Sequence, residues 1–208
     1  MVFIFQKDSE QPDQTLWSNS KELVDKQQEI FNRLWDLAIP LSVRNKDLVY
    51  QENQDYKKKL LDYNQIQKEI NSIIDLCRRE LILFASNGIL HKFIDMNEFV
   101  KIFVPLLRIG VTVKILTDKA DDNLIRQITA LNNTNRDNPI QFGYTNRLGN
   151  FNELVMLSDD KYILQIYYDP HNRLTATFSN ERHQILVQEI LFEKYWNEIN
   201  SLNLINSN

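Results

Sequence analysis

Residues 152–196 constrain the fold most, because they predict three strands joined by tight turns and followed by a long amphipathic helix. The second part of this stretch recurs at the start of the chain. With a constant shift of 161 positions and no gaps, residues 2–35 overlay residues 163–196. The identical pairs are Asp8 with Asp169, Ser18 with Ser179, Asn19 with Asn180, Gln27 with Gln188, Phe31 with Phe192 and Trp35 with Trp196. They fall at a turn, at the helix start and on the apolar helix face, so the repeat predicts two related lobes, of which the first is cut short.

Composition narrows the function classes. The net charge is −4 and the only run of basic residues is 57–59, which argues against binding a phosphate backbone and therefore excludes nucleic acid as a partner. A single cysteine, Cys77, leaves no internal disulfide and no cysteine-based metal site, and is typical of a cytoplasmic protein. The four glycines form no phosphate-binding loop, so we expect no cofactor and no metal. No apolar run reaches the length of a membrane span, and we expect no membrane contact by this chain.

The order of apolar patterns predicts an α/β fold, with a mixed, mostly parallel sheet covered by helices. Residues 1–40 predict a strand hairpin plus helix, 41–60 a connection, 61–203 the main α/β lobe and 204–208 a polar tail. Within the main lobe, the run 80–85, a helix over 99–107 and the run 111–116 predict a βαβ unit with parallel strands. Cys77 falls on the apolar face of the preceding helix, and the closing helix is expected to bury Val187, Ile190, Leu191, Tyr195 and Ile199. Trp35 and Trp196 are expected to be core or lobe-interface anchors.

Several stretches resemble a known family. They are residues 19–40 (NSKELVDKQQEIFNRLWDLAIP), 79–87 (RELILFASN), 108–117 (RIGVTVKILT) and 154–164, together with 176–180 and the closing helix to Trp196. In this order they resemble the phospholipase D-like sensor region at the N-terminus of thaumarchaeal (Nitrososphaera-type) sensor histidine kinases. The resemblance implies a phospholipase D-like fold, an archaeal signal-transduction role, further first-lobe strands upstream of Val2 and a histidine kinase core or other signalling protein as partner.

Phospholipase D-type catalysis uses H-x-K-x-x-x-x-D, because a phosphohistidine must form and its charge must be compensated. If Asp159 is the aspartate, Asn152 occupies the histidine position and Leu154 the lysine position. None of the histidines restores the motif: His91, His171 and His183 are followed two residues later by Phe93, Arg173 and Ile185. The resemblance therefore implies a phospholipase D-like scaffold that has retained the fold but lost the catalytic residues, so we predict that the chain is not an enzyme.

The polar residues at the predicted strand ends are candidates for ligand binding, since such edges form the usual crevice of an α/β sheet. They are Ser86, Asn87, Thr117, Asn152, Ser179 and Asn180. All are uncharged, which suits a neutral or weakly charged ligand. The alternative is structural: Ser179 and Asn180 would cap the last helix, and 86–88 would form a plain turn.

These patterns leave three hypotheses. The first is a non-catalytic sensory or regulatory module that binds a small ligand or a protein partner. The second is a phosphodiesterase or nuclease on the same fold. The third is a dimerisation or interaction domain, because residues 2–38 carry an open strand edge and an apolar helix face that a homodimer would cover.

Overall fold

The computed structural model describes residues 2–3, 15–16, 20–36, 38, 41–52, 55–95, 98–148, 151–168, 171 and 173–206. The chain divides into two compact units, Met1–Ala38 and Ile39–Asn208. Each is described separately below. No helix in the described ranges is both long enough and apolar enough to cross a membrane.

The first unit contains a strand pair and one helix. Strands β1 (Val2–Phe3) and β2 (Thr15–Leu16) pair in an antiparallel manner, and α1 (Lys21–Asp36) follows. The ring of Trp35 stacks on Phe31, one turn earlier, with 5.7 Å between ring centroids. Ser18 and Asn19, which the repeat places at the start of this helix, lie outside the described residues.

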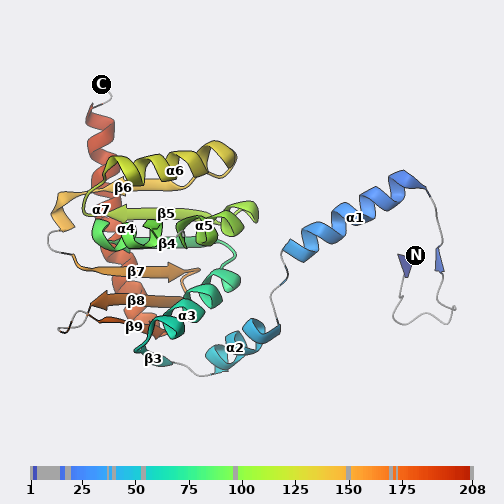
Figure 1. Ribbon diagram of the computed structural model, residues 1–208, viewed down its shortest axis with the longest axis horizontal. Coiled ribbons are helices and arrows are strands. Elements are labelled where there is room, and N and C mark those ends of the chain that lie inside the picture. Colours follow the sequence, from blue (N-terminus) through green and yellow to red (C-terminus); the bar gives the residue numbers. More distant parts are fainter. Residues whose placement is uncertain are drawn as a thin grey trace. The chain divides into compact units, whose positions relative to one another are not determined.

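The second unit contains a seven-stranded sheet with the strand order β3-β9-β8-β7-β4-β5-β6 (Figure 1). The strands are β3 (Lys57–Leu60), β4 (Glu80–Ala85), β5 (Thr112–Thr117), β6 (Gln141–Tyr144), β7 (Glu153–Ser158), β8 (Tyr162–Tyr168) and β9 (Leu174–Ser179). Only β4 with β5 and β5 with β6 are parallel; the other four neighbouring pairs are antiparallel. The mixed α/β class is therefore confirmed, but the expectation of a mostly parallel sheet is wrong. The turns between β7, β8 and β9 are too short for a crossover, so they form antiparallel hairpins.

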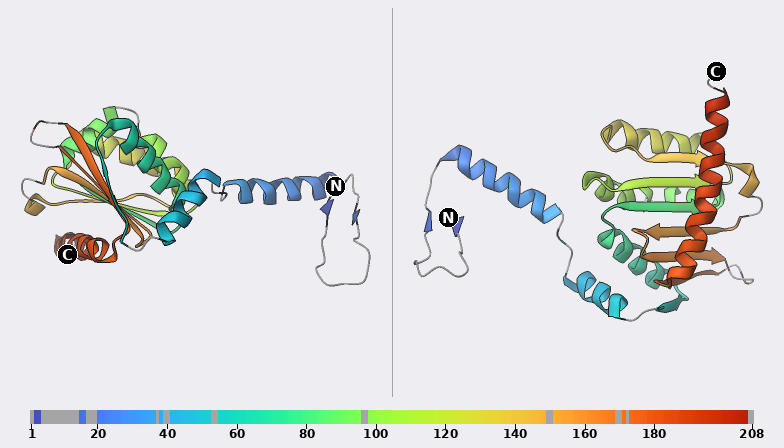
Figure 2. Two further views of the ribbon diagram at one scale, coloured as in Figure 1. Left: turned by 90° about the horizontal axis from the view of Figure 1, so that it is seen from below. Right: turned by 180° about the vertical axis from the view of Figure 1, so that it is seen from behind.

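Helices cover both faces of the sheet. The helices are α2 (Leu41–Glu52), α3 (Tyr63–Leu76), α4 (Asn87–Asp95), α5 (Glu98–Arg108), α6 (Asp122–Thr134) and α7 (Arg182–Asn206), with a short 3-10 turn, η1 (Asn146–Leu148). Helices α3 to α6 lie on one face, and α7 crosses the other (Figures 1 and 2). Both α2 and β3, from the expected connection, belong to the second unit, where β3 is an edge strand.

The sheet has a hydrophobic core on each face, and the side chains of β4 alternate between the two, as the pleat of a strand requires. Leu81 and Leu83 pack in the first core, beneath α3, α5 and α6. Ile82 and Phe84 pack in the second core, beneath α7. The second core also contains Phe192, and Trp196 packs against it. This explains the nearly continuous apolar run of β4, because a strand covered on both faces buries every side chain.

The repeated segments agree in element order but not in strand register. Helix α1 begins at Lys21, which is 161 positions before Arg182, the first residue of α7. The register of β1 with β2 nevertheless differs by two residues from that of β8 with β9, since Val2 pairs with Leu16 whereas Ile163 pairs with Ser179. Ile4, at which the equivalence with Gln165 would be judged, lies outside the described residues.

Candidate functional site

The six predicted ligand-binding residues lie at two opposite edges of the sheet. At the edge where β4 and β5 end, Ala85 is paired with both Thr117 and Leu154. Ser86, Asn87, Thr117 and Asn152 therefore lie at this edge. Ser179 pairs with Ile163, and Ile163 pairs with Leu157, so Ser179 and Asn180 lie at the other edge. The structure does not bring the six residues into one site.

At the first edge, Asn87 joins α4 to the start of α6. Its main-chain N–H donates to Asp118 Oδ1 at 2.6 Å, and its Nδ2 donates to Asp121 Oδ2 at 3.0 Å. Asp121 caps α6 by accepting from Asn123 N and Leu124 N, and it also contacts His91 Nε2. The hydrogen bond from Leu124 N, followed by those from Asn87 and His91, holds the pKa of Asp121 well below its usual range.

Ser86 begins α4, because its carbonyl oxygen accepts from Ile89 N and Leu90 N. Ser86 Oγ and Asn87 Oδ1 are buried without a hydrogen-bond partner among the described residues. Asn152 is exposed. A ligand role for the residues at this edge stays a prediction.

The three positions that correspond to the catalytic motif do not form a reactive group. Asn152 precedes β7, Leu154 is 1% exposed within the first core, and Asp159 follows β7 at the opposite edge. The six residues of β7 separate Asn152 from Asp159 by about 20 Å of extended strand. These positions therefore cannot act together on one phosphate.

The Asp159 carboxylate instead binds the main chain where β4 begins. Its Oδ2 accepts from Arg78 N at 2.8 Å, and its Oδ1 accepts from Arg79 N at 2.8 Å and Glu80 N at 2.9 Å. Its own N–H donates to Glu80 O at 3.0 Å, and its φ of 53° lies in the left-handed region. Asp159 thus fastens the β7–β8 turn to the neighbouring strand.

Cys77 is fully buried beside this carboxylate, which confirms that it is a core residue. Its Sγ donates to Glu80 O at 3.4 Å. Burial, more than any neighbouring group, raises the pKa of the Cys77 thiol to about 12. The thiol therefore stays protonated at neutral pH and is a poor nucleophile.

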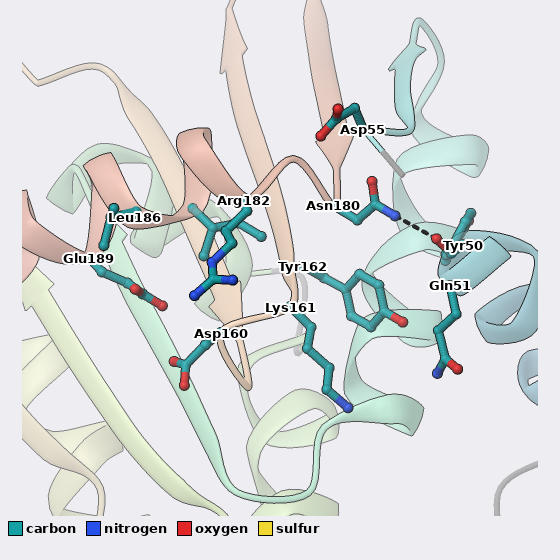
Figure 3. Close-up of a pocket in the computed structure, with 11 residues that line it drawn as sticks. Tyr50, Gln51, Asp55, Asp160, Lys161, Tyr162, Asn180, Arg182, Leu186 and Glu189 are labelled. Carbon is teal, nitrogen blue, oxygen red and sulfur yellow. Dashed lines mark hydrogen bonds between the residues drawn. The ribbon is translucent and has the colours of Figure 1, made fainter. Parts of the chain in front are cut away.

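A groove of 870 Å³ lies at the edge that carries Asn180 (Figure 3). It is bounded by the end of α2, the β7–β8 turn and the first turns of α7. Its lining residues are Tyr50, Gln51, Asp55, Asp160, Lys161, Tyr162, Asn180, Arg182, Ile185, Leu186 and Glu189. A volume of this size is typical of sites that hold small organic ligands.

Aromatic rings attach the end of α2 beside this groove. Tyr50 packs on Phe178 and on Tyr162, with ring centroids 4.7 Å and 5.9 Å apart. Its hydroxyl donates to Glu69 Oε1 at 2.9 Å. Burial, with the Glu69 carboxylate as the next cause, raises the pKa of Tyr50 far above its usual value, so the hydroxyl remains a donor.

Asn180 connects three chain segments. Its Nδ2 donates to Tyr50 O at 2.6 Å, and its Oδ1 accepts from Tyr56 N at 2.6 Å. Its main-chain N–H donates to Tyr56 O at 3.1 Å. Ser179 Oγ accepts from Glu181 N at 3.0 Å, just before α7. These bonds give both residues a structural role, and Asn180 also lines the groove.

The groove carries five charged groups that the sequence did not single out, of which Asp55 lies just before β3. Asp160 and Lys161 come from the β7–β8 turn, and Arg182 and Glu189 come from α7. Glu189 Oε1 is buried and has no hydrogen-bond partner in the described part of the chain. Burial and the contact with Asp160 raise the pKa of Glu189 to about 7. The Glu189 carboxyl group therefore titrates near neutral pH.

Neither a protein-family model nor a curated protein matches the chain. Similar folds occur among solved structures at low identity. TrmBL2, described as an archaeal chromatin protein with a novel mode of DNA binding, has a TM-score of 0.47 and 15% identity, covering 85% of this chain and 66% of its own. NucT from Helicobacter pylori has a TM-score of 0.42 and 13% identity, covering 71% of this chain and 97% of its own. Phosphatidylserine synthase from Haemophilus influenzae Rd KW20 has a TM-score of 0.36 and 12% identity, covering 68% and 37%.

NucT and phosphatidylserine synthase have phospholipase D-like folds, as the sequence resemblance implied for this chain. Similarities at this level of sequence identity concern the fold and do not show a shared activity. Sensor histidine kinases are not among these three structures. The exclusion of nucleic acid as a partner is corrected by the likeness to TrmBL2, which is described as binding DNA. Net charge averages over the whole surface, so a value of −4 does not exclude that class of partner.

Proposed function

We propose that Ile39–Asn208 is a non-catalytic sensory or regulatory domain of phospholipase D-like fold, which binds a small ligand in the groove. The observation that carries this proposal is the set of hydrogen bonds that the Asp159 carboxylate accepts. It is the one motif residue retained, and its carboxylate is already bound to three main-chain N–H groups. Leu154, at the position of the phosphate-binding lysine, is part of the core.

The attachment of α2 suggests how binding is transmitted. Tyr50 and Gln51, in the last part of α2, line the groove, whereas Leu41, Leu48 and Val49 of the same helix are exposed. A ligand that contacts Tyr50 or Gln51 changes the stability of the docked helix relative to the undocked one. Since α2 is the segment that follows the first unit in the chain, this population shift would reach Met1–Ala38.

The absence of phosphodiester chemistry is tested with bis-p-nitrophenyl phosphate. We expect the full chain and its Asn152→Ala variant to release p-nitrophenol at the same rate, equal to the rate without protein. Asn152 is exposed, so the substitution should leave the fold intact, and equal melting temperatures would check this. Hydrolysis by the unmodified chain that vanishes in the variant would favour a phosphodiesterase or nuclease instead.

Ligand binding in the groove is tested by a thermal-shift screen against a metabolite collection. A ligand at 100 times its Kd adds about 2.7 kcal/mol to the unfolding free energy, which for a domain of this size raises Tm by roughly 5–10 °C. We expect the shift to disappear in Arg182→Ala and to persist in the control Arg126→Ala, which removes an exposed arginine from α6. Shifts that survive Arg182→Ala, or a collection without any stabilising compound, would contradict a ligand site in the groove.

A further inference from the structure

Glu69 of α3 places a carboxyl group inside the second unit. The residue is 1% exposed and belongs to the buried face of its helix. Glutamate is almost never fully buried unless it is paired, because a carboxylate loses its hydration there. The hydroxyl of Tyr50, near the end of α2, donates to Glu69 Oε1 at 2.9 Å. The interior therefore holds a polar acceptor that is matched to a phenolic hydroxyl.

Three aromatic rings surround the ring of Tyr50. The ring centroids of Phe178, Tyr56 and Tyr162 lie 4.7, 5.1 and 5.9 Å from that of Tyr50. We call these three rings and the Glu69 carboxyl group the socket. Aromatic walls favour a ring, and a buried acceptor disfavours a ring that brings no donor. The socket is therefore built to hold a phenol and to reject the same ring without its hydroxyl.

Helix α2 depends on this one side chain for its attachment. Among the α2 side chains whose burial the structure describes, Tyr50 alone is buried, at 3% exposed. The others are exposed: Leu41, Arg44, Asn45, Leu48, Val49 and Gln51. Asn180 Nδ2 adds a hydrogen bond to Tyr50 O. A short helix with so little buried surface is not stable by itself, so loss of the Tyr50 contacts is expected to release it.

We propose that the socket is a binding site for a phenolic ring, that Tyr50 occupies it as an internal competitor, and that a phenol-bearing ligand displaces Tyr50 and releases α2. Tyr50 and Tyr162 also line the groove, so the socket opens into the groove when Tyr50 leaves (Figure 3). This inference goes beyond the proposed function, because it assigns a second site that does not use the charged residues of the groove. Since Tyr50 is part of the same chain, its effective concentration is of the order of millimolar, and a free phenol binds the unmodified chain only weakly.

Tyr50→Ala removes the competitor, because the atoms that it deletes are those of phenol. Titration of the full chain with phenol, followed by saturation-transfer NMR, measures binding. We expect Tyr50→Ala to bind phenol at least tenfold tighter than the unmodified chain, and to bind benzene more weakly than phenol, since benzene offers Glu69 no donor. Tyr50→Phe keeps a ring in the socket and should bind phenol no better than the unmodified chain. Glu69→Gln, combined with Tyr50→Ala, should reduce the preference for phenol over benzene.

A second probe distinguishes two sources of the phenolic ring. N-acetyl-L-tyrosinamide carries the ring on an amino-acid backbone. If it binds to Tyr50→Ala as tightly as phenol does, the socket accepts a tyrosine side chain of a partner protein. If phenol alone binds, the ligand is a small phenolic molecule.

Hydrogen exchange of the full chain measures the release of α2. The main-chain amides of residues 45–51 should exchange at least tenfold faster in Tyr50→Ala than in the unmodified chain, whereas those of β8 should be unchanged. Tyr144→Ala is the matched control, because it removes a tyrosine that is 58% exposed on β6, and it should leave the exchange of α2 unchanged.

Two results would overturn the socket. One is phenol binding by Tyr50→Ala that is no tighter than that of the unmodified chain or of benzene, and the other is exchange of α2 that Tyr50→Ala does not accelerate. If Tyr50→Ala unfolds without ligand, phenol and not benzene should restore its circular dichroism spectrum, and failure to do so would also refute the socket. Arg182→Ala should leave phenol binding unchanged. If phenol does not bind while a metabolite shift still depends on Arg182, the socket is wrong and the proposed function stands.

Discussion

Replacement of Asp159 by alanine is expected to lower the unfolding free energy by about 3–5 kcal/mol, the range for breaking a buried, charge-assisted hydrogen-bond network. The substitution leaves the N–H groups of Arg78, Arg79 and Glu80 without their acceptor at a site where Asp159 itself is only 8% exposed. It also puts alanine at a φ of 53°, which a residue with a Cβ but without a short polar side chain tolerates poorly. Urea denaturation followed by circular dichroism measures the change.

Two companion variants separate the causes. Asp159→Asn keeps one acceptor oxygen and tolerates the left-handed conformation, so its loss should be smaller than that of alanine. Asp160→Ala is the control for backbone conformation, because Asp160 has a φ of 57° but is exposed, and its carboxylate contacts the side chains of Arg79 and Glu189. It should cost about 1 kcal/mol or less. A loss below 1 kcal/mol in Asp159→Ala would show that Asp159 does not hold the turn to β4.

Much of the fold follows from local patterns. The apolar run 80–85 predicted the strand β4, and residues 152–196 predicted the strands β7, β8 and β9 joined by tight turns. The predicted strand directions were wrong because the parallel arrangement of one βαβ unit was assumed for the whole sheet. The antiparallel pairing of β7 with β4 joins segments about 70 residues apart in sequence, and no local signal specifies it.

The buried face of α7 was only partly predictable. Val187 and Ile190 were expected to be buried but are 47% and 58% exposed, whereas Ile185 and Phe192 are buried. Apolar residues occur around much of this helix, so periodicity alone does not select one face. The packing partner selects the buried face. Gly143 of β6 leaves room for Trp196, because a Cβ atom on residue 143 would lie 3.2 Å from the Trp196 ring.

The groove could not be read from the sequence, because its walls come from segments far apart in the chain. Tyr50 and Tyr162 meet only after β3 pairs with β9 and β9 with β8. One sequence signal was available: Glu189 lies among the apolar residues of a helix expected to face the core. A carboxyl group in such a position must be neutralised or bound, and this is a mark of functional sites.

Glu189→Gln is expected to make the chain more stable at pH 8 and to leave its stability nearly unchanged at pH 5. The carboxyl group titrates near its ordinary value of 4.5 when the chain is unfolded and at about 7 when it is folded. Between these values the folded state binds more protons than the unfolded state, so the contribution of Glu189 falls as pH rises and is lost above about pH 7. The full shift corresponds to about 3.4 kcal/mol, and partial contact with solvent reduces the expected gain to about 1–2 kcal/mol.

Urea denaturation of both proteins at pH 5, 6, 7 and 8 measures this difference, in which the titration of all other groups largely cancels. Glu29→Gln is the matched control, since Glu29 is exposed on α1 and forms an ion pair with Arg33, four residues later. Its difference from the unmodified chain should stay within about 0.5 kcal/mol at every pH. If the stability of Glu189→Gln runs parallel to that of the unmodified chain from pH 5 to pH 8, the pKa of Glu189 is not raised in the folded chain, and burial beside Asp160 does not hold its proton.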